Sequence, residues 1–102
     1  MMKLVEEKLT DIIALCKVHQ VDSFALFGSA VNDTMQGSSD IDFLVNFSDA
    51  IEVLHYADNY FSLLEKLENL LGKKIDLVSK KSLKNPILIE EIDRSKVDLY
   101  AA

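Results

Sequence analysis

The stretch that most constrains this chain is residues 28–42, which read GSAVNDTMQGSSDID. It places a Gly-Ser turn directly after one apolar segment, residues 21–27, and two alternating aspartates, Asp40 and Asp42, at the start of another. Because side chains alternate between the two faces of a strand, both carboxylates are expected on one face. Neighbouring carboxylates disfavour each other's charged form unless a cation offsets them. The stretch therefore predicts a phosphate-binding turn beside a site for a divalent cation.

A third aspartate, Asp76, lies within the apolar segment KIDLVS, residues 74–79. If this segment pairs as a strand with residues 40–47, Asp76 can converge with Asp40 and Asp42 on one site. Hard oxygen ligands suit Mg²⁺, which is usually held by one or two carboxylates together with substrate phosphates. Any one of these aspartates could instead be a strand-end or turn residue. The combination of all three with the Gly-Ser turn favours a metal site.

Hydrophobic periodicity predicts an alternation of helices and strands. Strands are expected over residues 21–27, 40–47, 74–79 and 97–100, and helices over residues 3–18, about 30–34, about 50–71 and from residue 86 onwards. No repeat or linker interrupts the pattern, and a chain of 102 residues is typical of one domain. The prediction is a single α/β (α+β) domain over residues 1–102, a small mixed β-sheet packed with helices.

Several local signals mark the ends of these helices. Asp49 followed by Glu52 predicts a capping box, so that the long helix should begin near Ala50, and Gly72 should end it. Its apolar stripe is expected to contain Phe61, Leu64, Leu67, Leu70 and Leu71. Tyr56 and Tyr60 of the same helix could line a nucleotide pocket or pack in the core. Asn85 and Pro86 are a typical N-cap and first residue of the last helix.

Composition excludes several classes of function. The formal net charge of -6 argues against binding to a nucleic-acid backbone, which depends on many lysine and arginine contacts. A single cysteine, Cys16, cannot form an intrachain disulfide, and it lies at helical spacing as a core residue. Glu6 and Glu7 stand where a signal peptide needs an apolar run, and no segment approaches the ~18 apolar residues of a membrane helix. We expect a soluble, cytoplasmic protein that binds neither nucleic acid nor membrane.

At its aspartates and its Gly-Ser turn the chain resembles the minimal nucleotidyltransferases (MNT type) of the polymerase beta superfamily. The family pattern is Gly-Ser, ten residues, Asp-x-Asp and a later aspartate in a strand. Gly28 and Ser29 match the turn, Asp40 and Asp42 follow at the family's spacing, and Asp76 matches the third acid. The spaced pattern is specific, and the resemblance extends over nearly the whole chain.

The resemblance implies a Mg²⁺-dependent nucleotidyltransferase that uses ATP or another nucleoside triphosphate. Asp40, Asp42 and Asp76 would be the catalytic and metal-binding residues, and Gly28 and Ser29 would bind the nucleotide. Asp76 would help to bind a second metal ion or accept the proton of the attacking hydroxyl. The minimal proteins of this family are typically encoded with a helical HEPN-domain partner, and some act as antitoxins that adenylylate a tyrosine of it. The sequence leaves oligomerisation open.

One departure from the family keeps other functions in view. Many members carry arginines after Gly-Ser, where this chain has Ala30, Val31, Asn32 and Asp33. Arginine there would bind phosphates, so an arginine restored at position 30 is expected to tighten ATP binding. One alternative is a catalytically inactive binding module that neutralises its partner by occupancy. Another is a receiver-like phosphorylation domain, which would need its acids at the C-terminal ends of parallel strands.

Overall fold

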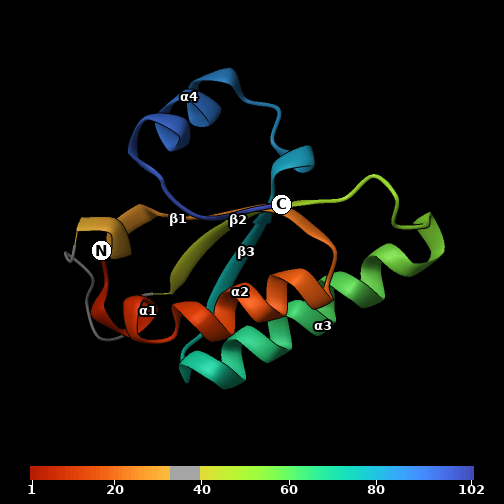
Figure 1. Ribbon diagram of the computed structural model, residues 1–102. Helices are drawn as coiled ribbons and strands as arrows, with labels where there is room; N and C mark the ends of the chain where they lie inside the picture. Colours follow the sequence, from red (N-terminus) through yellow and green to blue (C-terminus); the bar gives the residue numbers. More distant parts are fainter. Residues whose placement is uncertain (33–39) are drawn as a thin grey trace.

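A four-stranded mixed β-sheet forms the centre of the computed structural model, which describes residues 1–32 and 40–102 (Figure 1). The strand order is β3-β2-β1-β4. The strand bounds are β1 (Val21–Phe27), β2 (Ile41–Phe47), β3 (Ile75–Ser79) and β4 (Val97–Ala101), each within one residue of the prediction. β1 is antiparallel to β2 and β4, whereas β2 and β3 are parallel. The predicted mixed sheet is thereby confirmed.

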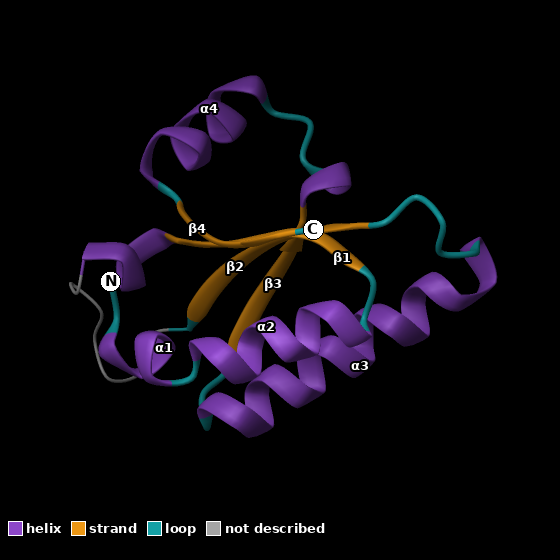
Figure 2. Ribbon diagram, in the orientation of Figure 1, coloured by secondary structure: helices purple, strands orange, loops and turns teal. Residues whose placement is uncertain are grey.

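Helices cover both faces of this sheet (Figure 2). On one face lie α1 (Lys3–Glu7), α2 (Leu9–Val18) and α3 (Val53–Leu71), and on the other lies α4 (Pro86–Ser95). Two short 3₁₀ segments, η1 (Gly28–Asn32) and η2 (Lys80–Ser82), directly follow β1 and β3. The predicted helix over residues 30–34 corresponds to η1, although residues 33 and 34 lie outside the described residues.

Two hydrophobic clusters of unequal size hold the helices to the sheet. The larger one lies between the sheet and α1 to α3, and its fully buried members include Ile12, Phe24, Phe43, Leu63 and Leu67. Cys16 belongs to it, as predicted. The smaller cluster, Ala25, Leu44 and Ile92, attaches α4 to the other face. Because strand side chains alternate, the odd-numbered residues of β2 fill the larger cluster and the even-numbered residues face the α4 side.

Several predicted helix details differ from the structure. The first helix is divided by a turn at Lys8. α3 begins at Val53 rather than near Ala50, because the Asp49 carboxylate is paired with Lys81 and forms no helix cap. Its buried stripe is Leu63, Leu67 and Leu71, while Phe61, expected in the stripe, is 62% exposed.

The two predicted end signals of the later helices are confirmed. Gly72 ends α3 in the left-handed conformation, with φ 65°. The Asn85 side chain accepts hydrogen bonds from the backbone N–H groups of Ile87 and Leu88, so it caps α4 as expected. Within residues 1–32 and 40–102, no helix is both long and apolar enough to cross a membrane.

Candidate active site

The parallel pairing of β2 with β3 brings two of the predicted acids together. Asp42 and Asp76 are direct neighbours in the register, and both alternate with core residues, so their carboxylates lie on the α4 face of the sheet. Asp40 immediately precedes β2 and is exposed. All three lie at the beginnings of their strands. A receiver-like domain would need them at the opposite ends, so this topology does not support that alternative.

Electrostatic repulsion is concentrated on Asp42. The pKa of Asp42 is raised to about 6, chiefly by partial burial and additionally by the nearby charge of Asp76, a side-chain hydrogen bond with Asp76 and the charge of Asp40. Asp76 and Asp40 are both exposed. A cation at this position would favour the charged form of Asp42 and remove the repulsion between the two carboxylates.

Gly28 touches the Asp42 carboxylate from the neighbouring strand. It directly follows Phe27, the β1 residue paired with Asp42, and has φ 75°. A Cβ at this position would overlap with Asp42 Oδ2 and would come within 3.2 Å of its Cγ. Glycine is therefore required at position 28 for two independent reasons, the left-handed backbone and the close approach of the carboxylate.

The predicted nucleotide-binding turn adopts the η1 conformation. Ser29 follows Gly28 in this segment and is half-buried. Ala30 is only 1% exposed and belongs to the larger hydrophobic cluster, and its carbonyl accepts a hydrogen bond from the Met2 N–H. The expectation that an arginine at position 30 could contact phosphates is therefore wrong, because the side chain at this position points into the core. Asp33 lies outside the described residues.

The candidate metal ligands form a pair with a nearby third acid rather than a closed cluster. Across residues 1–32 and 40–102, no group of three or more histidine, cysteine, aspartate or glutamate residues is arranged to hold a metal ion. Asp42 and Asp76 supply adjacent carboxylate oxygens, and Asp40 adds charge. This donor set fits Mg²⁺, which commonly binds one or two carboxylates and completes its coordination with water and substrate phosphates.

The two tyrosines of α3 lie on the opposite face of the sheet from these acids. Both pack edge-on against Phe47, with ring centroids 5.4 Å away for Tyr56 and 6.4 Å away for Tyr60. The Tyr60 hydroxyl donates to the Leu77 carbonyl over 2.5 Å, and the Tyr56 hydroxyl is hydrogen-bonded to Ser79. Both residues therefore pack, which was one of the two predicted roles, and they also line a pocket, which lies on the face of the sheet opposite the acids.

Comparison with known families agrees with this arrangement. The family described as "Polymerase beta, Nucleotidyltransferase" matches residues 8–102. The chain belongs to this family. It is accordingly a nucleotidyltransferase, as the family resemblance implied.

Two relatives of this nucleotidyltransferase carry more specific names. MJ1379 of Methanocaldococcus jannaschii, named as a candidate protein adenylyltransferase, is 38% identical over 79 residues, which are 78% of this chain and 77% of the relative. The protein adenylyltransferase MntA of Thermococcus cleftensis is 40% identical over 67 residues, 66% of this chain and 64% of that protein.

Solved structures share the fold of this nucleotidyltransferase. A candidate minimal nucleotidyltransferase superposes with a TM-score of 0.79 at 28% identity, covering 95% of both chains. A toxin-antitoxin structure with AMP-PNP gives a TM-score of 0.71 at 25% identity, covering 92% of this chain and 73% of that one. A complex of an MNT antitoxin with a tri-AMPylated HEPN toxin from Shewanella oneidensis gives 0.66 at 22% identity, covering 95% and 72%. At that identity the last likeness shows the fold alone.

Proposed function

We propose that this chain transfers AMP from ATP to a hydroxyl of a partner protein, and that it is the antitoxin half of a pair with a HEPN-domain toxin. The observation that carries the proposal is the pairing of Asp42 with Asp76 beside Gly28, because it combines two carboxylates with an open backbone turn at one end of the sheet. Nucleotidyl transfer depends mostly on positioning and electrostatics, so few side chains suffice.

Each residue at this end of the sheet has a distinct part in the proposal. Asp42 and Asp76, with Asp40, would hold Mg²⁺, which when bound neutralises negative charge on phosphate oxygens. Gly28 and Ser29 would orient the triphosphate through backbone N–H groups. A backbone without a side chain at position 28 lets phosphate and Asp42 occupy neighbouring space. This arrangement does not need the arginines that the turn lacks.

In the proposed transfer step, Asp76 accepts the proton of the attacking hydroxyl. The acceptor hydroxyl oxygen forms a bond to the α-phosphorus of ATP, the bond from that phosphorus to the bridging oxygen breaks, and pyrophosphate leaves. The hydroxyl proton passes to the Asp76 carboxylate, which is exposed and therefore accessible to a protein substrate. Asp42 is less accessible to a protein substrate because it is more buried than Asp76.

The names of similar proteins support the proposed nucleotide and partner. Two relatives are named as protein adenylyltransferases, one of them MntA, and a structural neighbour was solved with AMP-PNP. That neighbour is a toxin-antitoxin structure. These likenesses support ATP as the substrate and a toxin as the acceptor, and the family resemblance implies that this toxin is a HEPN-domain protein. A cytoplasmic location belongs to the same proposal.

Label transfer from α-labelled ATP to a co-expressed HEPN-domain partner tests this function. We expect label on the partner with wild-type protein and Mg²⁺, and none with EDTA. Asp76→Asn keeps the side-chain shape but removes the charge, so transfer should fall by at least 100-fold while partner binding persists. Asp11→Asn on α2, an exposed aspartate on the other face, is the matched control and should transfer at the wild-type rate.

The missing turn arginines favour a second candidate, an inactive module that neutralises its partner by occupancy. In that case neither wild type nor Asp76→Asn would label the partner, yet both would bind it with equal affinity. Wild-type labelling that Asp76→Asn leaves unchanged would instead remove Asp76 from the catalytic residues and leave the transferase activity in place.

A further inference from the structure

The first turns of α3 expose an unusual amount of apolar surface. Val53 is 90% exposed, Leu54 88% and Phe61 62%, and Ala57 between them is exposed as well. Residues 54, 57 and 61 recur at helical spacing, so they lie along one side of the helix. Large apolar side chains gathered on one side in this way mark interaction sites more often than scattered ones do.

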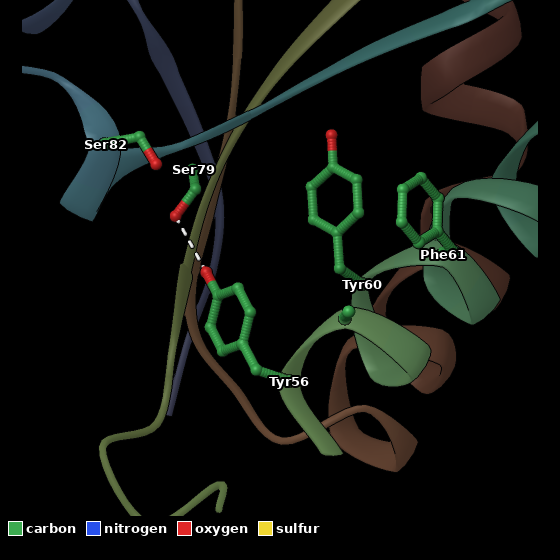
Figure 3. Close-up of a pocket in the computed structure, with 6 residues that line it drawn as sticks. Tyr56, Tyr60, Phe61, Ser79 and Ser82 are labelled. Atoms are coloured by element: carbon green, nitrogen blue, oxygen red, sulfur yellow. Dashed lines mark hydrogen bonds between the residues drawn. The ribbon is translucent and has the colours of Figure 1, made fainter. Parts of the chain in front are cut away.

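This stripe borders a pocket of about 300 Å³ between α3 and the end of β3 (Figure 3). Tyr56, Tyr60 and Phe61 form the α3 wall, and Ser79 and Ser82 form the opposite wall. The ring of Phe61 packs edge-on against Tyr60, with centroids 5.1 Å apart. We call the pocket together with Val53, Leu54 and Ala57 the α3 groove. Aromatic walls with a few hydroxyl groups are suited to holding one apolar side chain of a partner.

Acidic side chains flank the apolar stripe. Asp58 follows Leu54 by four residues and precedes Phe61 by three, and Glu65 follows Phe61 by four, so both are neighbours of the stripe on the helix surface. Both are exposed. On the far side, the Lys81 ammonium is neutralised by Asp49 at 2.6 Å. A second copy packed symmetrically through the same stripe would bring its own Asp58 and Glu65 to this acidic surface. A segment carrying lysine or arginine complements them.

The α3 groove and the Asp76 carboxylate lie on opposite faces of the edge strand β3. β3 is at the edge of the sheet, with Asp76 on the α4 face and Ser79 at the groove. The Tyr60 hydroxyl is hydrogen-bonded to Leu77, the residue directly after Asp76. Asp76 is near the start of β3 and Ser79 is at its end, so a protein held in the groove would pass around this edge and back along the strand to present a hydroxyl to Asp76.

We propose that the α3 groove docks the protein acceptor, through a segment that inserts an apolar side chain between Tyr56, Tyr60 and Phe61 and places lysine or arginine beside Asp58 and Glu65. The inference rests on the proposed function, since it assigns the docking place of the same acceptor. Docking here would hold the acceptor hydroxyl near Asp76 without any contact to ATP. It would therefore control recognition of the protein and leave recognition of the nucleotide unchanged.

Variants of groove residues test this in the full chain, with the HEPN-domain partner as the probe. We expect Phe61→Ser and Leu54→Ser each to weaken partner binding at least 10-fold in calorimetry, and to raise KM for the partner but not for ATP. Val18→Ser, which removes a 75% exposed valine from α2, is the matched control. Asp58→Lys should weaken binding and reduce its dependence on salt, whereas Asp11→Lys should do neither.

The outcomes separate docking from catalysis. Full partner binding by Phe61→Ser and Leu54→Ser, with wild-type transfer, would overturn the groove and leave the proposed transferase intact. Loss of binding in these variants, in a protein that never labels its partner, would support the groove and refute the transfer. Wild type that neither binds nor labels the HEPN-domain protein would overturn both. A change in ATP affinity in Phe61→Ser relative to wild type would show that the nucleotide binds in the groove. This result would also count against a protein occupant.

Discussion

Gly28 leaves room for the Asp42 carboxylate: at φ 75° it follows the β1 residue paired with Asp42, and any Cβ there would overlap with Asp42 Oδ2. The glycine of the turn and the second acid of the Asp-x-Asp pattern are far apart in sequence but are one structural unit. A substitution at position 28 therefore changes the carboxylate as well as the turn.

Gly28→Ala and Gly72→Ala make a matched pair for testing this unit. Both glycines have positive φ, 75° and 65°, but a Cβ at position 72 would meet nothing within 4 Å. Each alanine should lower the free energy of unfolding by about 1–2 kcal/mol through backbone strain. Only Gly28→Ala should also lose affinity for ATP and Mg²⁺, because it displaces Asp42. Urea unfolding and calorimetric titration measure the two effects. Equal ATP affinity in both variants would show that the turn has no part in binding.

The raised pKa of Asp42 predicts how stability depends on pH. The carboxyl loses its proton near its ordinary value of 3.8 in the unfolded chain but at about 6 in the folded protein. Between these values the folded state binds more protons, so the free energy of unfolding should fall as pH rises from about 4 to about 6. Above pH 6 the Asp42 carboxyl is ionised in both states, so the full loss of stability is present.

Asp42→Asn should remove this dependence. We expect a higher Tm at pH 7.5 without Mg²⁺, equivalent to about 1 kcal/mol after allowance for solvent screening, and a flatter Tm profile between pH 4 and 6. Asp11→Asn, at an exposed position on α2, should leave the profile unchanged. A lower Tm for Asp42→Asn at pH 7.5 would mean that the charged carboxylate stabilises the fold.

Magnesium and ATP are expected to stabilise the protein together. A ligand that binds only the folded state adds ~2.7 kcal/mol to the free energy of unfolding at a hundred times its Kd. Because the two acids offer an incomplete ligand set, Mg²⁺ should need the ATP phosphates, and ATP should need the cation to approach the acids. Thermal shift with both, and little with either alone, is the expected pattern. An equal shift in Asp42→Asn would refute the assignment of the site.

Ala30→Arg tests the structural account of the turn. Ala30 is 1% exposed within the larger hydrophobic cluster, so a long charged side chain cannot fit without displacing its neighbours. We expect the substitution to lower the free energy of unfolding by ~1–3 kcal/mol, the usual range for overpacking. It should not tighten ATP binding. Ala50→Arg, at an exposed position, should leave stability within about 0.5 kcal/mol. Chemical unfolding measures the free energy of unfolding of both variants.

Local patterns were enough to predict the mixed sheet and most element bounds. The alternation of charged and apolar residues around Asp40, Asp42 and Asp76 predicted one acidic face, because side-chain direction in a strand follows from the period of two alone. The Asn85 cap and the Gly72 end were equally predictable, since each depends on hydrogen bonds or backbone angles within a few residues.

Tertiary contacts decided the features that local patterns predicted wrongly. Asp49 had the sequence of a helix cap, but Lys81, far along the chain, pairs with its carboxylate, so α3 starts later. His19, directly after the end of α2, is 4% exposed and hydrogen-bonded to Ser62 of α3. In both cases the partner comes from a distant segment, and the sequence near the residue contains no trace of it.

The sequence by itself determined that this chain would place acids and a Gly-Ser turn at the ends of its strands, and hence its family. Only the tertiary structure decided that Asp42 would lie beside Asp76 and against Gly28, that Ala30 would face the core, and that Tyr56 and Tyr60 would line a groove on the other face. Strand periodicity sets the direction of a side chain, whereas its neighbours depend on which strands and helices pack together, and that choice is made by the whole hydrophobic core.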